Sequence, residues 1–155
     1  MRTVSVLLAK KGAQNNFVDA NATVLEALNK MQCDNLSYVI VMQNNHYLGV
    51  LSERDYVRKV ILVDKHSHTT LVKEIMTRDL PYVSSDDAVD HCLMLMNLYR
   101  TRYLPVFDEF KFKGVLTIND LLREAVNDHD LAAMAEETIC NKWVGEGYEK
   151  GSIVY

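Results

Sequence analysis

The stretch Gly49–Asp55 reads Gly-Val-Leu-Ser-Glu-Arg-Asp, and it returns 65 residues later, at Gly114–Asp120, as Gly-Val-Leu-Thr-Ile-Asn-Asp. Each copy joins a short apolar run, typical of a strand, to a hydroxyl residue that can cap a helix. The same offset aligns residues 18–60 with residues 83–125 without a gap, and 11 of the 43 positions are identical. We therefore predict a tandem duplication of two similar units that pack face to face.

The pattern of apolar residues predicts the same β-α-β-β-α order in both units, and therefore an α/β (α+β) fold with pseudo-twofold symmetry. Apolar residues at helical spacing indicate the helices, and continuous apolar runs indicate buried strands. In the first unit the predicted elements are a strand at 17–18, a helix from a cap at Asn21 or Thr23 to about Cys33, strands at 38–42 and 47–52, and a helix at 53–63. In the second they are a strand at 82–83, a helix from Asp86 through Leu98, strands at 103–107 and 112–117, and a helix at 118–126. Pro105, inside a predicted strand, indicates an edge or a missing donor that faces a ligand.

The predicted organisation of the chain has five segments. The two units are 17–63 and 79–127. Before them comes 1–16, an N-terminal segment with a short helix or strand; between them lies 64–78, a polar linker with a short helix at 71–76; and after them comes 128–155, a C-terminal helix at about 130–140 and a tail.

Composition narrows the class of protein. The 155 residues are 48% hydrophobic with a net charge of −4, as in an ordinary soluble protein, and this charge argues against a nucleic-acid partner. No apolar run approaches the ~20 residues of a membrane span, and the apolar run after Met1 is too short for a signal peptide. We expect a cytoplasmic protein in which Cys33 and Cys92 are buried, reduced thiols.

With these motifs in view, the sequence resembles a tandem pair of CBS domains, also called a Bateman module. The residues that carry the resemblance are the two copies of Gly-apolar-apolar-(Ser/Thr)-x-x-Asp, the Leu104-Pro105-Val106 run, the entry at 75–77, and the stretch 52–60, which is similar to small stand-alone pairs. The resemblance covers residues 3–127. The first unit departs from the pattern, with Ile40 where Pro105 stands and Ser37 where Arg102 stands.

The resemblance implies a regulatory, energy-sensing module that binds an adenosine-containing ligand, such as AMP, ADP, ATP, NAD(H) or S-adenosylmethionine, and signals to a partner enzyme, channel or transporter. One carboxylate can accept hydrogen bonds from both ribose hydroxyls, and guanidinium groups pair with phosphate. The expected ribose contacts are Asp55 and Asp120, with Ser52, Thr117, Thr77 and Asn119 beside them. The expected phosphate contacts are Arg54, Arg58 and Arg102, with Arg123 as a weaker candidate. The expected adenine contacts are Val18, Asp19 and Tyr38 in the first unit and Val83, Ser84, Tyr103, Leu104 and Pro105 in the second.

Other interpretations stay open. Ser52-x-x-Asp55 and Thr117-x-x-Asp120 also fit helix-capping boxes, in which the acid only satisfies the start of the helix. The sequence holds no phosphate-binding glycine loop and no nucleophile with its base, so we expect no enzyme and no catalytic cofactor. His66 and His68 lack the further ligands that a metal site needs. We also expect a homodimer through apolar helix faces that include Val57, Ile61, Leu93 and Leu122, and a purely structural dimerisation module with empty clefts is the alternative function.

Overall fold

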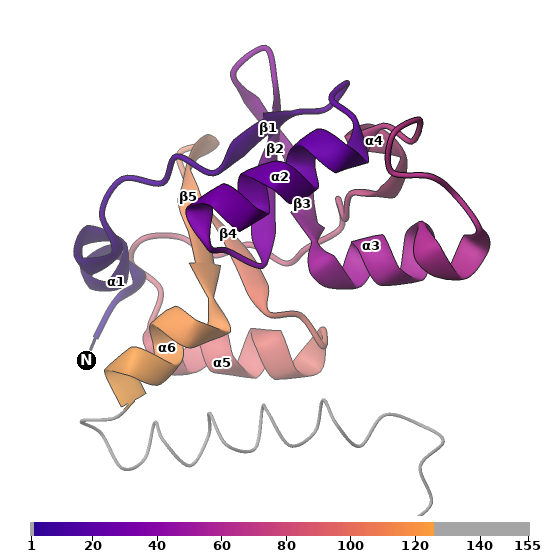
Figure 1. Cartoon of the computed structure of the whole chain (residues 1–155). Helices are drawn as coiled ribbons and strands as arrows, with labels where there is room; N and C mark the ends of the chain where they lie inside the picture. The colour runs from indigo at the N-terminus through magenta and orange to yellow at the C-terminus, as the bar shows by residue number, and fades with distance from the viewer. Residues whose placement is uncertain (1, 126–155) are drawn as a thin grey trace, which may run out of the picture.

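The computed structural model describes residues 2–125, and within them it confirms two units of mixed helix and strand (Figure 1). An N-terminal arm, residues 2–16, carries the first helix. The elements in chain order are α1 Val4–Lys11, β1 Phe17–Asp19, α2 Val24–Asp34, β2 Tyr38–Gln43, β3 His46–Ser52, α3 Glu53–Lys59, the 3-10 turn η1 Ile61–Val63, α4 Val72–Ile75, α5 Val89–Leu98, β4 Tyr103–Asp108, β5 Lys111–Thr117 and α6 Ile118–Ala125. The predicted helix at 130–140 and the tail lie outside the described residues.

Each unit is built on one antiparallel hairpin. In the first unit β2 pairs with β3, and β1 adds a parallel edge to give the order β1-β2-β3. In the second unit β4 pairs with β5 alone, with the same register shift near the turn. The gapless repeat therefore corresponds to two copies of one backbone plan, as the sequence predicts.

The predicted strand at 82–83 is not a strand: it is reduced to a single bridge between Val83 and Val106. The reason is Pro105. In the first unit the N–H of Ile40 donates to the carbonyl of Asn16 and extends the ladder. Pro105 stands at the position equivalent to Ile40 and has no N–H, so the ladder cannot continue in that direction.

Three further expectations are wrong in detail. The helix at 53–63 ends at Lys59, because Val60 leaves the helical region with φ −123°, and a 3-10 turn follows. Helix α5 starts at Val89 rather than Asp86, because the Asp87 carboxylate closes a turn by accepting the N–H of Ser84 at 2.7 Å. Cys33 is exposed, whereas Cys92 is buried, and burial raises the pKa of its thiol to about 12.

The segment before each unit packs its helix into the core of the other unit. Helix α4, from the linker, packs Val72 and Ile75 into the core of the first unit. Helix α1, from the N-terminus, instead packs Val4 and Leu7 into the core of the second unit, about 100 residues away along the chain. The N-terminal arm is thus a structural part of the second unit.

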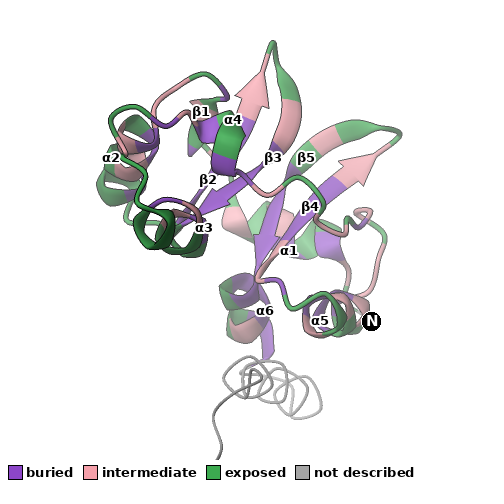
Figure 2. Ribbon diagram, turned by 90° about the vertical axis from the view of Figure 1, so that its right-hand side faces the viewer, coloured by how far each residue is buried: buried purple, intermediate pink, exposed green. Residues whose placement is uncertain are grey.

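The two hairpins lie side by side, with helices on their outer faces (Figure 2). Residues at equivalent positions of the two units meet in this contact. The rings of Tyr38 and Tyr103 are 4.9 Å apart, and those of Tyr47 and Phe112 stack at 4.6 Å. Such pairing of a residue with its own counterpart is the mark of an approximate twofold axis between the units.

Gly49 is required by a close approach of the linker. A Cβ atom there would lie 2.5 Å from the carbonyl oxygen of Thr77. The backbone of Thr77 forms two hydrogen bonds with the backbone of Val50, one in each direction. We expect Gly49→Ala to destabilise the protein by about 2–4 kcal/mol, because the linker must move and these bonds weaken. Urea unfolding measures the loss. Gly12→Ala is the comparison for a backbone cost alone, since a Cβ at Gly12 meets nothing within 4 Å, while its φ of 75° with ψ of −167° costs any other residue about 1–3 kcal/mol. No loss of stability in Gly49→Ala would contradict the assignment.

Candidate functional site

Two clefts open between the units. The first cleft, of about 360 Å³, lies between the start of α3, the linker and the segment before β4. The second cleft, of about 690 Å³, lies between the N-terminal arm, the end of α2 and the start of α6. Ser37, Arg102 and Tyr103 line both clefts. Each cleft is thus bounded by both units and by one of the two connecting segments.

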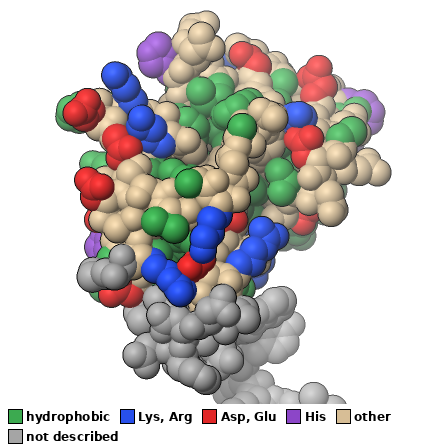
Figure 3. Space-filling view, turned by 90° about the vertical axis from the view of Figure 1, so that its left-hand side faces the viewer, with side chains coloured by type: hydrophobic (Ala, Val, Ile, Leu, Met, Phe, Trp, Pro, Cys, Tyr) green, Lys and Arg blue, Asp and Glu red, His purple; other side chains and the backbone are tan. Residues whose placement is uncertain are grey.

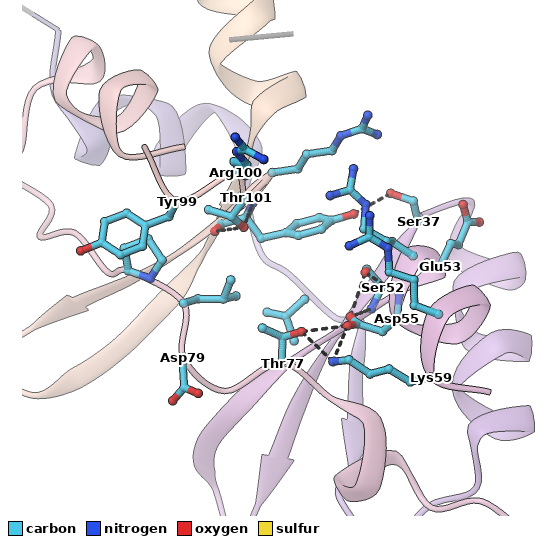
Figure 4. Close-up of a pocket in the computed structure, with 17 residues that line it drawn as sticks. Ser37, Ser52, Glu53, Asp55, Lys59, Thr77, Asp79, Tyr99, Arg100 and Thr101 are labelled. Carbon is cyan, nitrogen blue, oxygen red and sulfur yellow. Dashed lines mark hydrogen bonds and ion pairs between the residues drawn. The ribbon is translucent and has the colours of Figure 1, made fainter. Parts of the chain in front are cut away.

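Asp55 lies at the base of the first cleft, in the first turn of α3. Its Oδ2 atom accepts hydrogen bonds from the N–H and the hydroxyl of Ser52, both at 2.9 Å. Its Oδ1 atom accepts from the Thr77 hydroxyl at 2.8 Å and pairs with Lys59 Nζ at 2.7 Å (Figure 4). The Ser52 hydroxyl accepts the Asp55 N–H at 3.3 Å and completes a capping box.

Asp120 holds the equivalent place in the second cleft. The N–H and hydroxyl of Thr117 donate to its Oδ2 atom at 2.8 and 2.9 Å. Lys11 Nζ, from the N-terminal arm, donates to the same oxygen at 2.7 Å, and also to the carbonyl of Val115 and the hydroxyl of Tyr38. The capping interpretation is therefore correct for both motifs as local structure, and it leaves the ribose prediction open, since one carboxylate has room for both kinds of contact.

The N-terminal arm is fastened beside this cleft by Glu124 of α6. Its carboxylate pairs with Arg2 at 2.9 Å and with Lys10 at 2.7 Å. Figure 3 shows basic side chains gathered beside acidic ones on the face of the molecule that carries α1. Lys11 and Gln14 also line this cleft, and neither is among the residues predicted from the sequence. The available signal was the repeat itself, which aligns Lys59 with Glu124 and so shows that a lysine is missing from the second unit.

Titration of Glu124 should make the anchoring of the arm depend on pH. The hydrogen bond from Lys10, and then the charge of Arg2, lower the pKa of Glu124 below its ordinary 4.5. This stabilisation is present above pH 4.5 and is lost as the pH falls through the lowered pKa. We expect wild type to exceed Glu124→Gln by about 1 kcal/mol in unfolding free energy at pH 7, and the difference to vanish in acid. Urea unfolding of both proteins from pH 7 downward measures this. A difference that does not change with pH would contradict the ion-pair explanation.

Arginine side chains gather over the first cleft. Burial lowers the pKa of Arg54, and the nearby positive charges of Arg58 and Arg102 lower it further. Within residues 2–125 none of these three guanidinium groups forms an ion pair with a carboxylate. Like charges held together in a cleft are suited to an anionic group that bridges them.

The structure brings most of the predicted site residues to the clefts, but not all. Ser52, Arg54, Asp55, Arg58 and Thr77 line the first cleft, and Tyr38, Thr117, Asn119, Asp120 and Arg123 line the second.

The predicted adenine contacts Val18, Asp19, Val83, Ser84, Leu104 and Pro105 line neither cleft. Leu104 and Val83 are core residues of the second unit, and the carbonyl of Pro105 accepts the Val83 N–H. Of the predicted adenine positions, the two tyrosines remain at the cleft walls.

Two other kinds of site find no support in the part of the chain that the structure covers. Among residues 2–125, no group of three or more His, Cys, Asp or Glu side chains is arranged to hold a metal ion. None of the helices described there is long and apolar enough to cross a membrane.

Comparison with known proteins matches this chain to one family model. The model of the CBS domain matches twice, over residues 14–62 and 72–127. These ranges contain both hydroxyl-x-x-Asp motifs and both hairpins.

Solved structures and curated relatives agree with that match. A crystal structure described as a CBS domain is 38% identical, covers 81% of this chain and 98% of its own, and has a TM-score of 0.76. A putative signal-transduction protein with CBS domains from Burkholderia ambifaria is 34% identical, covers 82% of this chain and 96% of its own, and has a TM-score of 0.77. The CBS domain-containing protein CBSX3, mitochondrial, of Arabidopsis thaliana is 29% identical over 82% of this chain, and the match spans 66% of that relative's length.

Proposed function

The chain belongs to the CBS-domain family, and from this premise we propose that it is a regulatory, non-catalytic module that binds an adenosine-containing nucleotide between its two units. Ligand binding then changes the surface or the stability of the pair, and a partner enzyme or transporter responds. We propose that the module works in the cytoplasm, where it meets its ligand and its partner.

One observation carries the proposal: Asp120 and Thr117 place a carboxylate and a hydroxyl together at the base of a cleft, at the start of α6, where backbone N–H groups also favour an anion. Asp55 and Ser52 form the equivalent helix start in the first unit. The cleft volumes, about 360 and 690 Å³, fall in the range of small-ligand sites. A ribose needs such an acceptor, and its phosphates need cations nearby.

Both clefts offer those cations. Arg54, Arg58 and Arg102 line the first, while Lys10, Arg102 and Arg123 line the second. Tyr103 at both clefts, and Tyr38 at the second, supply aromatic walls for a base. AMP, ATP and NAD(H) all combine these three chemical parts, and they are the ligands to test first.

A thermal-shift panel tests the proposal against the alternative of a structural module with empty clefts. We expect AMP, ATP or NADH to raise the melting temperature in a concentration-dependent way, because a ligand that binds only the folded state stabilises it. Ribose 5-phosphate and inorganic phosphate are the controls for the sugar and the charge. Mass spectrometry of the purified protein then identifies any nucleotide that it retains. No shift with any nucleotide would favour the structural module, and turnover of a nucleotide would contradict a non-catalytic role.

We also propose that the module acts as a homodimer. Exposed apolar side chains crowd the outer side of α3 and η1: Val57, Ile61, Leu62 and Val63, with exposed fractions of 47 to 73%. Leu93, predicted from the sequence to lie on such a face, is fully buried instead, and Leu122 is half-buried. Water-facing apolar groups in such number are typical of an interface, and a twofold contact is the commonest arrangement.

Light scattering at tens of micromolar tests the dimer. We expect a dimer mass for wild type and a monomer mass for Leu62→Asp, because an unpaired charge cannot be buried in the contact without a large cost. Lys65→Asp, just beyond the 3-10 turn, is the control for an added charge outside the apolar group. A monomer mass for wild type would contradict the proposal.

A further inference from the structure

The two cleft carboxylates differ in how their oxygens are used. A carboxylate has about four acceptor positions, two on each oxygen. Asp55 fills both oxygens with protein donors: two from Ser52 on Oδ2, and Thr77 with Lys59 on Oδ1. Asp120 accepts three hydrogen bonds, and all three arrive at Oδ2. Within residues 2–125 its Oδ1 atom has no protein partner.

One cause of this difference is a reversal of charge in the repeat. Lys59, which pairs with Asp55 Oδ1 from one turn further along α3, aligns with Glu124 in α6. A glutamate cannot donate to a carboxylate, and Glu124 is held by Arg2 and Lys10 instead. The second unit receives its lysine from the N-terminal arm, and Lys11 reaches only Oδ2.

The second cause lies in the segment that pairs with the hairpin. In the first unit the backbone of Thr77 bonds to Val50, and its hydroxyl remains free to donate to Asp55 Oδ1. In the second unit the side-chain amide of Gln14 takes over this backbone role. Its Nε2 donates to the carbonyl of Val115 at 2.9 Å, and its Oε1 accepts the Val115 N–H at 3.0 Å. Within residues 2–125 the Gln14 side chain bonds only to Val115 and makes no hydrogen bond to Asp120.

The unpaired oxygen is not fully enclosed by the described part of the protein. Within residues 2–125, the Tyr47 hydroxyl is the one side-chain polar group that is buried without a hydrogen-bond partner. Asp120 Oδ1 is therefore reachable from the cleft that Asp120 lines, and that cleft is the larger of the two. Lys11 already spends its three N–H donors on Asp120, Val115 and Tyr38, so it holds the carboxylate in place without covering Oδ1.

We propose that the two clefts are inequivalent: the second is the nucleoside site, where ribose hydroxyls donate to Asp120 Oδ1, and the first is closed to a ribose by Lys59 and Thr77. This inference rests on the proposed binding of adenosine nucleotides and adds which cleft takes the sugar. Lys11 is a positioning residue in it, and the N-terminal arm forms one wall of the site. A nucleoside at Asp55 must first displace two donors, which lowers its affinity there by about 10-fold or more.

Calorimetric titration of AMP into four proteins tests the inference: wild type, Asp120→Asn, Asp55→Asn and the double variant Lys59→Met/Thr77→Val. Wild type should bind one AMP per chain. Asp120→Asn should bind about 10- to 100-fold more weakly, while Asp55→Asn should stay within about 2-fold of wild type. The double variant frees Asp55 Oδ1, and it should bind a second AMP per chain, which a purely structural role of Lys59 and Thr77 does not predict.

The outcomes separate this inference from the proposed function. Two equal AMP sites in wild type, or a larger loss in Asp55→Asn than in Asp120→Asn, would overturn the inference while leaving nucleotide binding intact. No binding of AMP, ATP or NADH by wild type would overturn the proposed function, and the inference with it. Melting curves without ligand check that each variant folds, and if the double variant does not fold, the pair of asparagine variants decides.

Discussion

The Asp120→Ala variant is expected to bind AMP about 10- to 100-fold more weakly than wild type, a loss of roughly 1.5–3 kcal/mol. The ribose hydroxyls lose their charged acceptor, and the Lys11 ammonium group loses the carboxylate with which it forms an ion pair. Stability should fall as well, by about 1–3 kcal/mol, because the N–H and hydroxyl of Thr117 lose the same carboxylate. Calorimetric titration measures the affinity, and urea unfolding without ligand measures the stability.

Asp55→Ala is the matched control for the helix cap. It removes the same capping contacts and a comparable ion pair from the first unit, so its loss of stability should be similar, but its affinity for AMP should stay near that of wild type. Thr117→Val separates the hydroxyl from the acid while keeping the side-chain shape. If Asp120→Ala binds AMP as wild type does and only melts earlier, Asp120 is a helix cap and the assigned ribose contact is wrong.

The Leu93→Ala variant should destabilise the protein by about 2–5 kcal/mol, the range for deleting a fully buried leucine. Leu93 is 0% exposed and lies in the core that α1, α5 and α6 share. Leu28→Ala is the natural comparison, because Leu28 stands at the equivalent position of the first unit but is only partly buried. Urea unfolding should show a clearly smaller loss for Leu28→Ala. Equal losses would mean that the two helices are buried alike, contrary to the structure.

The repeat made most of the fold predictable from the sequence. Matching apolar positions at a constant offset fixed the hairpins and the helices that follow them, and the hydroxyl-x-x-Asp motif marked the helix starts correctly in both units. Local effects that differ between the copies were harder to predict. Pro105 removes one N–H from the ladder beside Val83, and Val60 ends α3 early.

The site was predicted less completely, because part of each cleft comes from outside the repeat. The sequence places Asp120 and Thr117 on the start of a helix, but nothing in the local pattern shows that α1 packs on the distant second unit. Lys11 and Gln14 were therefore not predicted as cleft residues. The residues that play the same parts in the first unit, Lys59 and Thr77, lie in or close to the first unit itself. The predicted adenine contacts Val83 and Leu104 follow from strand position, which does not show that their side chains lie in the core of the second unit.

The placement of α1 also sets an order of events while the chain is being made. Helix α1 is synthesised well before its partners, because it packs on α6 and β5, which follow it by about 100 residues. The first unit, with α4, can close as soon as residue 77 is available, since its contacts are near in sequence. Until α6 and β5 have been synthesised, the apolar side chains of Val4 and Leu7 lack their partners in the core of the second unit. Contacts between residues so far apart in sequence form late in folding. The second cleft, which is lined by both the N-terminal arm and α6, is therefore complete only after α6 has been synthesised.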